Sequence, residues 1–192
     1  MKKVMYFFSL VLVVVSCRSV YEPEAGRFYI ANDIESGLMP VSDFGNDVKM
    51  VQILTSNYNG KENTVDSIVK INNQEMLIIG MSDAVRLFTI RYNDDGVVAD
   101  FSPLMGFKKI RPEYIVSDIQ LIYYPLKAIQ KNLPKNMTVV DVQDKKMLRR
   151  EIFYGSEKIV HIKYLDKDIF KADVELDNLE RGYSYRIRNN NE

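Results

Sequence analysis

Hydrophobic and polar residues alternate along most of the chain after residue 47, in short runs separated by turn residues. A period of two places one side of a strand in a core and the other side in solvent. The pattern predicts two sets of five strands, at 48–58, 61–71, 75–81, 84–92 and 97–101, then at 138–142, 146–154, 157–165, 168–176 and 182–188. The turns "YNGK" and "NDDG" contain Asn-Gly and Asp-Gly, which favour tight hairpins and therefore antiparallel neighbours.

The segment between the two sets, residues 111–134, has a helical period instead. Apolar residues recur there every three or four positions and predict one helical stripe, formed by Ile115, Ile119, Ile122, Leu126, Ile129 and Leu133. Pro112 suits the first turn of a helix, and Pro134 marks its end. Pro125 is expected to kink or restart the helix near its middle.

Hairpin-length turns on both sides leave no role for this helix as the crossover of a parallel sheet. The predicted fold is therefore mainly β, an α+β arrangement with a strongly curved antiparallel sheet, or open half-barrel, of about ten to eleven strands. A central helical segment at about 112–132 is expected in the concave face. The side chains expected to line that face as a ligand cavity are Phe88, Ile90, Ile115, Ile119, Ile122, Leu126 and Tyr185.

The start of the chain follows a different pattern. Lys2 and Lys3 precede an apolar run of 12 residues at 4–15, interrupted only by a serine. A membrane-spanning helix needs roughly 20 apolar residues, so the run fits the apolar region of a secretory signal peptide. Ser16 and Cys17 follow, and this order resembles the lipobox of bacterial lipoproteins, in which the cysteine is acylated and becomes the first residue. Val14 stands where leucine is usual.

Cys17 is the only cysteine of the chain, which weakens the other interpretations of this residue. A disulfide needs a second cysteine, and a metal site needs several ligands where the chain offers one histidine. We therefore expect a signal peptide at 1–16, an acylated N-terminus with a short irregular tether at 17–27, and a single β-rich domain at 28–192. Several acyl chains anchor a protein stably, so a membrane is the expected first partner.

The residue after Cys17 and the net charge of the chain narrow its expected location and partners. Arg18, rather than aspartate, follows Cys17, which in enteric-type bacteria fits a lipoprotein of the outer membrane that faces the periplasm. Without Lys2 and Lys3, the 26 basic residues fall to 24 against 26 acidic ones, a net charge of −2. This balance gives no reason to expect nucleic acid as a partner.

One stretch carries a resemblance. "RPEYIVSDIQLIYYPLKAIQKNLP" at 111–134, with "MSDAVRLFTIRYNDDG" before it and "GYSYRIR" after it, resembles a family of uncharacterised lipoproteins that are commonly encoded in aryl polyene pigment gene clusters. The likeness runs from about 48 to 188. Its motif positions are Asp118, Gln120, Leu121, Tyr124 and Pro125, with Tyr124 where the family usually has tryptophan.

The resemblance implies a function. These proteins are similar in predicted shape to the carrier and receptor of the outer-membrane lipoprotein localisation pathway, whose open barrels take acyl chains. The resemblance thus implies that this protein binds an apolar or acylated cargo, such as a lipid, a lipoprotein or a polyene lipid. The alternative is an interaction or scaffold lipoprotein of an envelope assembly, with the concave face filled by its own helix.

Catalysis has little support in the sequence. None of the common hydrolase, zinc-protease, P-loop or dinucleotide motifs occurs, so we expect no enzyme, no cofactor and no metal site. Asp118 and Gln120 are expected either to hydrogen-bond backbone at the cavity rim or to touch a ligand headgroup. The basic cluster "DKKMLRRE" at 144–151 is expected to be a solvated face, or else a contact for anionic lipid heads.

Overall fold

A computed structural model describes residues 19–21, 27–31, 34–103, 111–144 and 147–190 of the chain. Its main element is an antiparallel sheet of eleven strands. The first set of strands comprises β4 (Val48–Tyr58), β5 (Lys61–Ile71), β6 (Met76–Ser82), β7 (Val85–Asn93) and β8 (Gly96–Phe101). The second set comprises β9 (Met137–Asp144), β10 (Met147–Tyr154), β11 (Glu157–Tyr164), β12 (Val174–Asn178) and β13 (Tyr183–Asn189).

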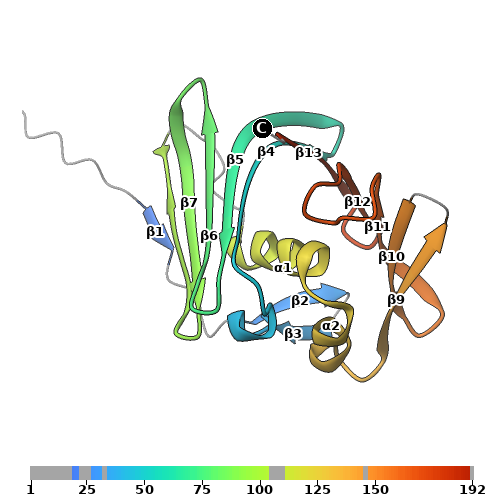
Figure 1. The fold of residues 1–192 in the computed structure, drawn as a ribbon. Helices are drawn as coiled ribbons and strands as arrows, with labels where there is room; N and C mark the ends of the chain where they lie inside the picture. Colours follow the sequence, from blue (N-terminus) through green and yellow to red (C-terminus); the bar gives the residue numbers. More distant parts are fainter. Residues whose placement is uncertain (1–18, 22–26, 32–33, 104–110, 145–146, 191–192) are drawn as a thin grey trace, which may run out of the picture.

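The two sets form one continuous sheet because the first strand of one pairs with the last strand of the other. The order is β1-β8-β7-β6-β5-β4-β13-β12-β11-β10-β9, so β4 and β13 join the halves. The sheet bends around the helices, which lie in its concave face (Figure 1). The predicted open, curved antiparallel sheet with a central helix is thereby confirmed.

The turn chemistry explains the hairpins. At the tip of β4–β5, Asn59 and Gly60 have φ values of 51° and 72°. Two consecutive positive φ values are the geometry of a type I′ turn, whose twist matches that of paired strands. The Asn-Gly pair thus sets the register of two eleven-residue strands, from Tyr58 opposite Lys61 to Val48 opposite Ile71.

One predicted strand, 168–176, is wrong in its first half. β12 begins only at Val174, and the residues before it form turns. Asp166 accepts the N–H of Asp168 at 2.9 Å, and Asp168 accepts the N–H of Phe170 at 3.1 Å. Aspartate side chains that hydrogen-bond nearby backbone compete with strand pairing, and here they turn the chain despite its alternating pattern.

Three further strands precede the first set. β1 (Ser19–Tyr21) lies within the segment expected to be an irregular tether, and it pairs with β8 at one edge of the sheet. β2 (Arg27–Ala31) and β3 (Ile34–Gly37) form a separate two-stranded sheet, followed by a short 3₁₀ helix, η1 (Val41–Asp43). These strands are absent from the sequence prediction. β2 and β3 pack on the central helix, with Phe28 edge-on to Tyr114 at 5.8 Å between ring centroids.

The central segment consists of two helices, α1 (Pro112–Tyr123) and α2 (Leu126–Asn132). Tyr124 is extended, with φ −71° and ψ 149°, because the residue before a proline disfavours the helical conformation. The predicted break at Pro125 is therefore present. α1 lies between the concave sheet and β2–β3, and its residues Val116 to Tyr123 are all buried.

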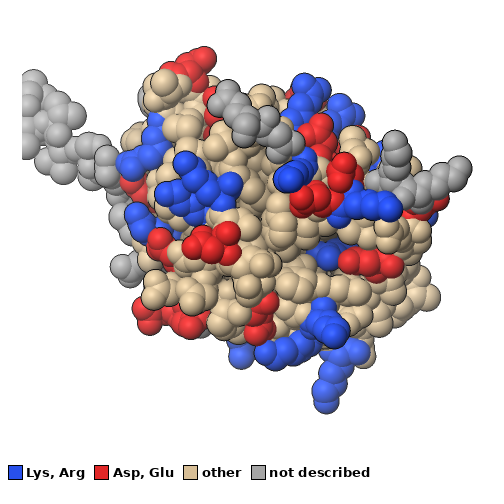
Figure 2. Space-filling model, viewed as in Figure 1, with Lys and Arg blue, Asp and Glu red and all other residues tan. Residues whose placement is uncertain are grey.

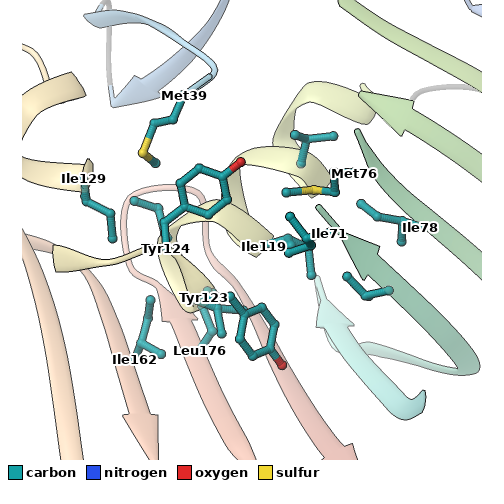
Figure 3. Packing of buried hydrophobic residues seen from close by; sticks show 14 of the residues in the cluster. Met39, Ile71, Met76, Ile78, Ile119, Tyr123, Tyr124, Ile129, Ile162 and Leu176 are labelled. Carbon is teal, nitrogen blue, oxygen red and sulfur yellow. The ribbon is translucent and has the colours of Figure 1, made fainter. Parts of the chain in front are cut away.

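Side chains from both halves of the sheet meet at α1. Figure 3 shows Ile119 beside Ile71 and Met76 of the first set, whereas Ile162 and Leu176 come from the second set. All five belong to one continuous hydrophobic core. On the outside, acidic and basic side chains are interspersed with uncharged ones over the face seen in Figure 2. The core therefore sits inside the curve of the sheet and is centred on α1.

Candidate functional site

The concave face is the candidate site, and the structure brings its predicted lining residues together. Ile90 and Ile122 are fully buried, and Phe88 and Ile119 are nearly so. The half-buried members of the set are Ile115, Leu126 and Tyr185, which pack against the same core. These residues contact the protein itself rather than an open space.

The interior of the curve is filled by the helices. A cavity of about 10 Å³ lies where α1 and α2 meet β3, next to Gln120, Leu121 and Leu133. That volume holds about one water molecule. Tyr123 and Tyr124, two of the largest side chains of the helical segment, have no exposed surface at all. The described residues therefore enclose α1 tightly.

Several polar side chains of α1 are hydrogen-bonded to the surrounding protein, whereas the buried Oε2 of Glu113 has no hydrogen-bond partner among the described residues. Gln120, 1% exposed, accepts the N–H of Met39 at 3.0 Å and donates to the carbonyl of Met39 at 2.6 Å. The Tyr92 hydroxyl donates to the same carbonyl at 2.9 Å. Burial raises the pKa of Tyr92 to about 12. Gln120 thus fixes the chain before η1 onto α1 through a pair of backbone contacts.

Arg150 of β10 holds the C-terminal end of α1. Its guanidinium donates to the carbonyls of Leu121, Ile122 and Tyr124 at 2.8, 3.2 and 2.9 Å. It also makes a two-pronged ion pair with Asp141 of β9, at 2.8 and 2.9 Å. The last carbonyls of a helix lack intrahelical partners and carry partial negative charge, so a buried cation suits this end.

Tyr164 of β11 also binds the C-terminal end of α1, because its hydroxyl donates to the carbonyl of Ile122 at 2.5 Å. On the other side of the helix, the Gln52 amide of β4 donates to the Tyr123 hydroxyl at 2.6 Å and to Asn189 of β13 at 2.7 Å. Burial raises the pKa of Tyr123 and of Tyr164 above the usual tyrosine range. Strands of both halves therefore hold α1 by polar contacts.

Asp118, near the middle of α1, forms a further polar cluster. Its carboxylate is 4% exposed and accepts the Tyr183 hydroxyl at 2.9 and 2.8 Å. Burial raises the pKa of Asp118 from 3.8 to about 7, although hydrogen bonds from Tyr183 and Tyr185 and the nearby charge of Arg181 oppose the shift. Asn178 of β12 donates to the same Tyr183 hydroxyl at 3.0 Å.

The motif residues of the predicted site therefore divide into three groups. Asp118 and Gln120 bind other parts of the protein, and Leu121 and Tyr124 are buried in the core. Pro125 is exposed in the break between the helices. Cys17, the predicted lipidation site, lies outside the described residues.

Sequence reasoning missed Arg150, which it placed in a solvated basic cluster. The structure contradicts that expectation for this residue, which is only 2% exposed. The sequence contains a signal for the burial of Arg150. Arg150 lies two residues before the inward-facing Ile152 in β10, so the two side chains share one face of the strand. The neighbouring Arg149 lies on the opposite face.

Two kinds of feature are absent from the residues that the structure describes. In them, no group of three or more histidine, cysteine, aspartate or glutamate side chains is arranged to bind a metal ion. Neither does any helix of these ranges have the length and apolar character needed to cross a membrane.

A family model matches most of the chain. A model of the family described as "Protein of unknown function (DUF3261)" matches residues 49–190, from β4 to just after β13. The matched region therefore contains α1, α2 and the polar contacts described above between them and the sheet, but not β1 or β2–β3. No curated protein matches the chain.

Proposed function

Because the chain belongs to the DUF3261 family, whose description gives no activity, we propose its function from its own residues: a non-catalytic, lipid-anchored interaction protein of the cell envelope. Acylation of Cys17 would hold it at a membrane, and the folded domain would act through its outer surface. The order of Lys2, the apolar run at 4–15 and Cys17 supports the anchor. Arg18 after the cysteine supports the outer membrane, with the domain in the periplasm.

The observation that carries the interaction role is the filled concave face. A carrier needs an apolar space for its cargo, and ligand sites commonly have several hundred cubic ångströms. Here α1 occupies the curve, with Ile122, Tyr123 and Tyr124 fully buried. Polar contacts from Arg150 and Gln120 hold it in place. Such a domain offers partners its exterior rather than its interior.

A carrier of lipids, lipoproteins or polyene lipids is the second candidate, and the break between α1 and α2 favours it. Tyr124 and Pro125 form a non-helical joint at which one helix can move relative to the other. Movement of α1 would open the apolar surface beneath it. The resemblance to lipoproteins of aryl polyene clusters, and to lipoprotein-localisation carriers, points to the same cargo class. This route requires the breaking of the Arg150 contacts.

The anchor is tested by metabolic labelling. Wild-type protein is expected to incorporate labelled fatty acid and to fractionate with the outer membrane. Cys17→Ala is expected to lose the label and to keep its signal peptide, because the acylated cysteine defines the cleavage site. Recovery of unlabelled wild type from the soluble periplasm would contradict the anchor.

The interaction role is tested against the carrier role by titration with fluorescent fatty-acyl and polyene probes. The protein is residues 17–192 with Cys17→Ser, and a fatty-acid-binding protein serves as positive control. We expect no saturable uptake. Saturable uptake that Leu126→Glu abolishes, while Val142→Glu on the exposed side of β9 leaves it intact, would favour the carrier. Thermal melts of both variants establish that they fold.

A further inference from the structure

We infer that the convex side of the first set of strands lies against an anionic membrane surface. The contact is the convex patch, defined here as Lys49, Val51, Ile68, Lys70, Leu77, Ile79 and Val98. The inference rests on the proposed lipid anchor and deepens it, because it states which face of the domain the anchor brings to the lipid. Three observations support it: an apolar row, a pair of facing lysines, and the position of β1.

The apolar row crosses three strands. Val51 is opposite Ile68, and Ile68 is opposite Ile79, so β4, β5 and β6 present adjacent aliphatic side chains. They alternate with the inward-facing core residues of the same strands and belong to no part of the core. Val51 is 41% exposed. A sheet face in solvent is normally polar, and a continuous apolar row on it marks a contact surface.

The next row carries two lysines that face each other. Lys49 of β4 is directly opposite Lys70 of β5, and both are exposed. Like charges at directly opposite positions of an antiparallel pair repel each other. Among the residues that the structure describes, neither lysine has an ion pair or a side-chain hydrogen bond. Binding to an anion would relieve this repulsion.

The lysine row continues into apolar residues. Lys70 is opposite Leu77 of β6, Leu77 is opposite Arg91 of β7, and Arg91 is opposite Val98 of β8. Arg91 has its own partner, Glu75, at 3.4 Å. Val98 is 52% exposed. Two adjacent rows thus combine aliphatic side chains with lysines, a residue type whose long apolar stem can cover neighbouring aliphatic surface while its charge stays in water.

β1, the strand that follows the predicted anchor in the chain, lies at the same half of the sheet. β1 begins at Ser19, two residues after Cys17, and pairs with β8 from Ser19 opposite Phe101 to Tyr21 opposite Ala99. Two residues span at most about 7 Å. The acyl chains would therefore enter the membrane close to β8, whereas the other sheet edge, β9, is the most distant strand. The concave side is covered by α1 and β2–β3, which leaves the convex side to meet the lipid.

An anionic bilayer is the occupant that fits these features together. Its phosphate-bearing headgroups complement Lys49 and Lys70, and its interface accepts the aliphatic row. A lysine near such a surface strengthens binding roughly fivefold. The patch is too weak to hold the domain alone, but the anchor makes its contact intramolecular and raises the effective concentration of lipid.

The test uses full-length acylated protein in vesicles of phosphatidylcholine with phosphatidylglycerol. Single cysteines at Val51→Cys and Val98→Cys, labelled with a fluorophore, report contact with a nitroxide lipid by quenching. Val142→Cys and Leu179→Cys, both exposed and distant from β1 in strand order, are the controls. We expect quenching at 51 and 98 at least twice that at 142 and 179. Equal quenching, or more at the controls, would overturn the inference.

Charge reversal tests the lysine pair. Lys49→Glu with Lys70→Glu is expected to remove the extra quenching at 51 that phosphatidylglycerol produces. Lys127→Glu with Lys135→Glu, which makes the same charge change on exposed lysines elsewhere, is expected to leave it unchanged. Equal effects of the two double variants would overturn the role of the patch. Protein that stays on vesicles without quenching at 51 or 98 overturns the inference alone, and protein that washes off vesicles overturns the anchor as well.

Discussion

A buried arginine on the concave face of the sheet and a pair of lysines on the convex face differ in their partners. On the concave side, the buried guanidinium of Arg150 has three carbonyls and a carboxylate as partners. On the convex side, Lys49 and Lys70 face each other, and each remains exposed. Both faces also carry aliphatic side chains. The concave ones are buried by α1, whereas Val51 remains 41% exposed on the convex side.

The difference separates residues that stabilise the fold from residues that are free to contact a partner. Buried polar groups without partners cost free energy, so the hydrogen bonds of Arg150, Gln120 and Asp118 favour one docked position of α1. Exposed groups on the convex side carry no such requirement, and their arrangement is free to serve a partner. Changes on the concave side should therefore lower stability, and changes on the convex side should not.

Arg150→Ala should have the largest effect on stability. It removes the partner of Asp141 and of three carbonyls at the end of α1, and loss of one member of a buried ion pair costs about 3–5 kcal/mol. Urea unfolding measures the change. Arg149→Ala, one residue away on the other side of β10, should change the free energy of unfolding by about 0.5 kcal/mol or less. Similar losses in both variants would remove the contrast between the faces.

Ile122→Ala should have the second-largest effect on stability. Ile122 is fully buried at the centre of the helical stripe, and truncation of a buried isoleucine costs about 2–5 kcal/mol. Ile115→Ala, at a half-buried position of the same stripe, should cost less. The same urea melts compare them. A loss below about 0.5 kcal/mol at Ile122 would mean that α1 contributes little to the fold.

Asp118 makes stability on the concave side depend on pH. Its pKa is about 7 in the folded protein, against an ordinary value of 3.8, so between these pH values the folded state binds more protons than the unfolded one. Stability should therefore fall as pH rises from about 4 to about 7, by up to about 1.4 kcal/mol per unit from this group. Asp118→Asn should remove that slope. Parallel pH curves for the variant and wild type would contradict the prediction.

Val51→Thr should have the smallest effect. The side chain lies on the convex side outside the core, so its replacement by a polar residue of the same shape should change stability by about 0.5 kcal/mol or less. Thermal melts at pH 7 check this. Val69→Thr on the inward side of β5, where the side chain is fully buried, is the matched control and should be clearly less stable.

Local chemistry explains which parts of the fold the sequence predicts. The Asn-Gly turn, the helical stripe and the break at Pro125 each depend on a few adjacent residues, and the structure contains all three. The strand at 168–176 fails because Asp166 and Asp168 offer the backbone a local alternative. β2 and β3 pack against α1, which lies more than 70 residues later in the sequence, so no local pattern predicts them.

The candidate site is harder to predict than the fold. The aliphatic residues of the concave face follow from periodicity, and their burial in one core agrees with it. The polar contacts do not, because a guanidinium that binds helix carbonyls looks in sequence like any arginine of a charged surface. Whether the curve holds a ligand or a helix depends on packing volume. Alternation along strands carries no information about that volume.

The joint between β4 and β13 has a consequence for how the chain folds. Tyr58 is opposite Tyr183, so this pairing closes a loop of 183 − 58 = 125 residues. Pairings this distant in sequence form slowly, because chain entropy must be overcome before any contact is gained. β4 therefore has an open edge until the last strand arrives. A nascent chain that still lacks residues 183–189 can form the first hairpins but cannot complete the sheet around α1.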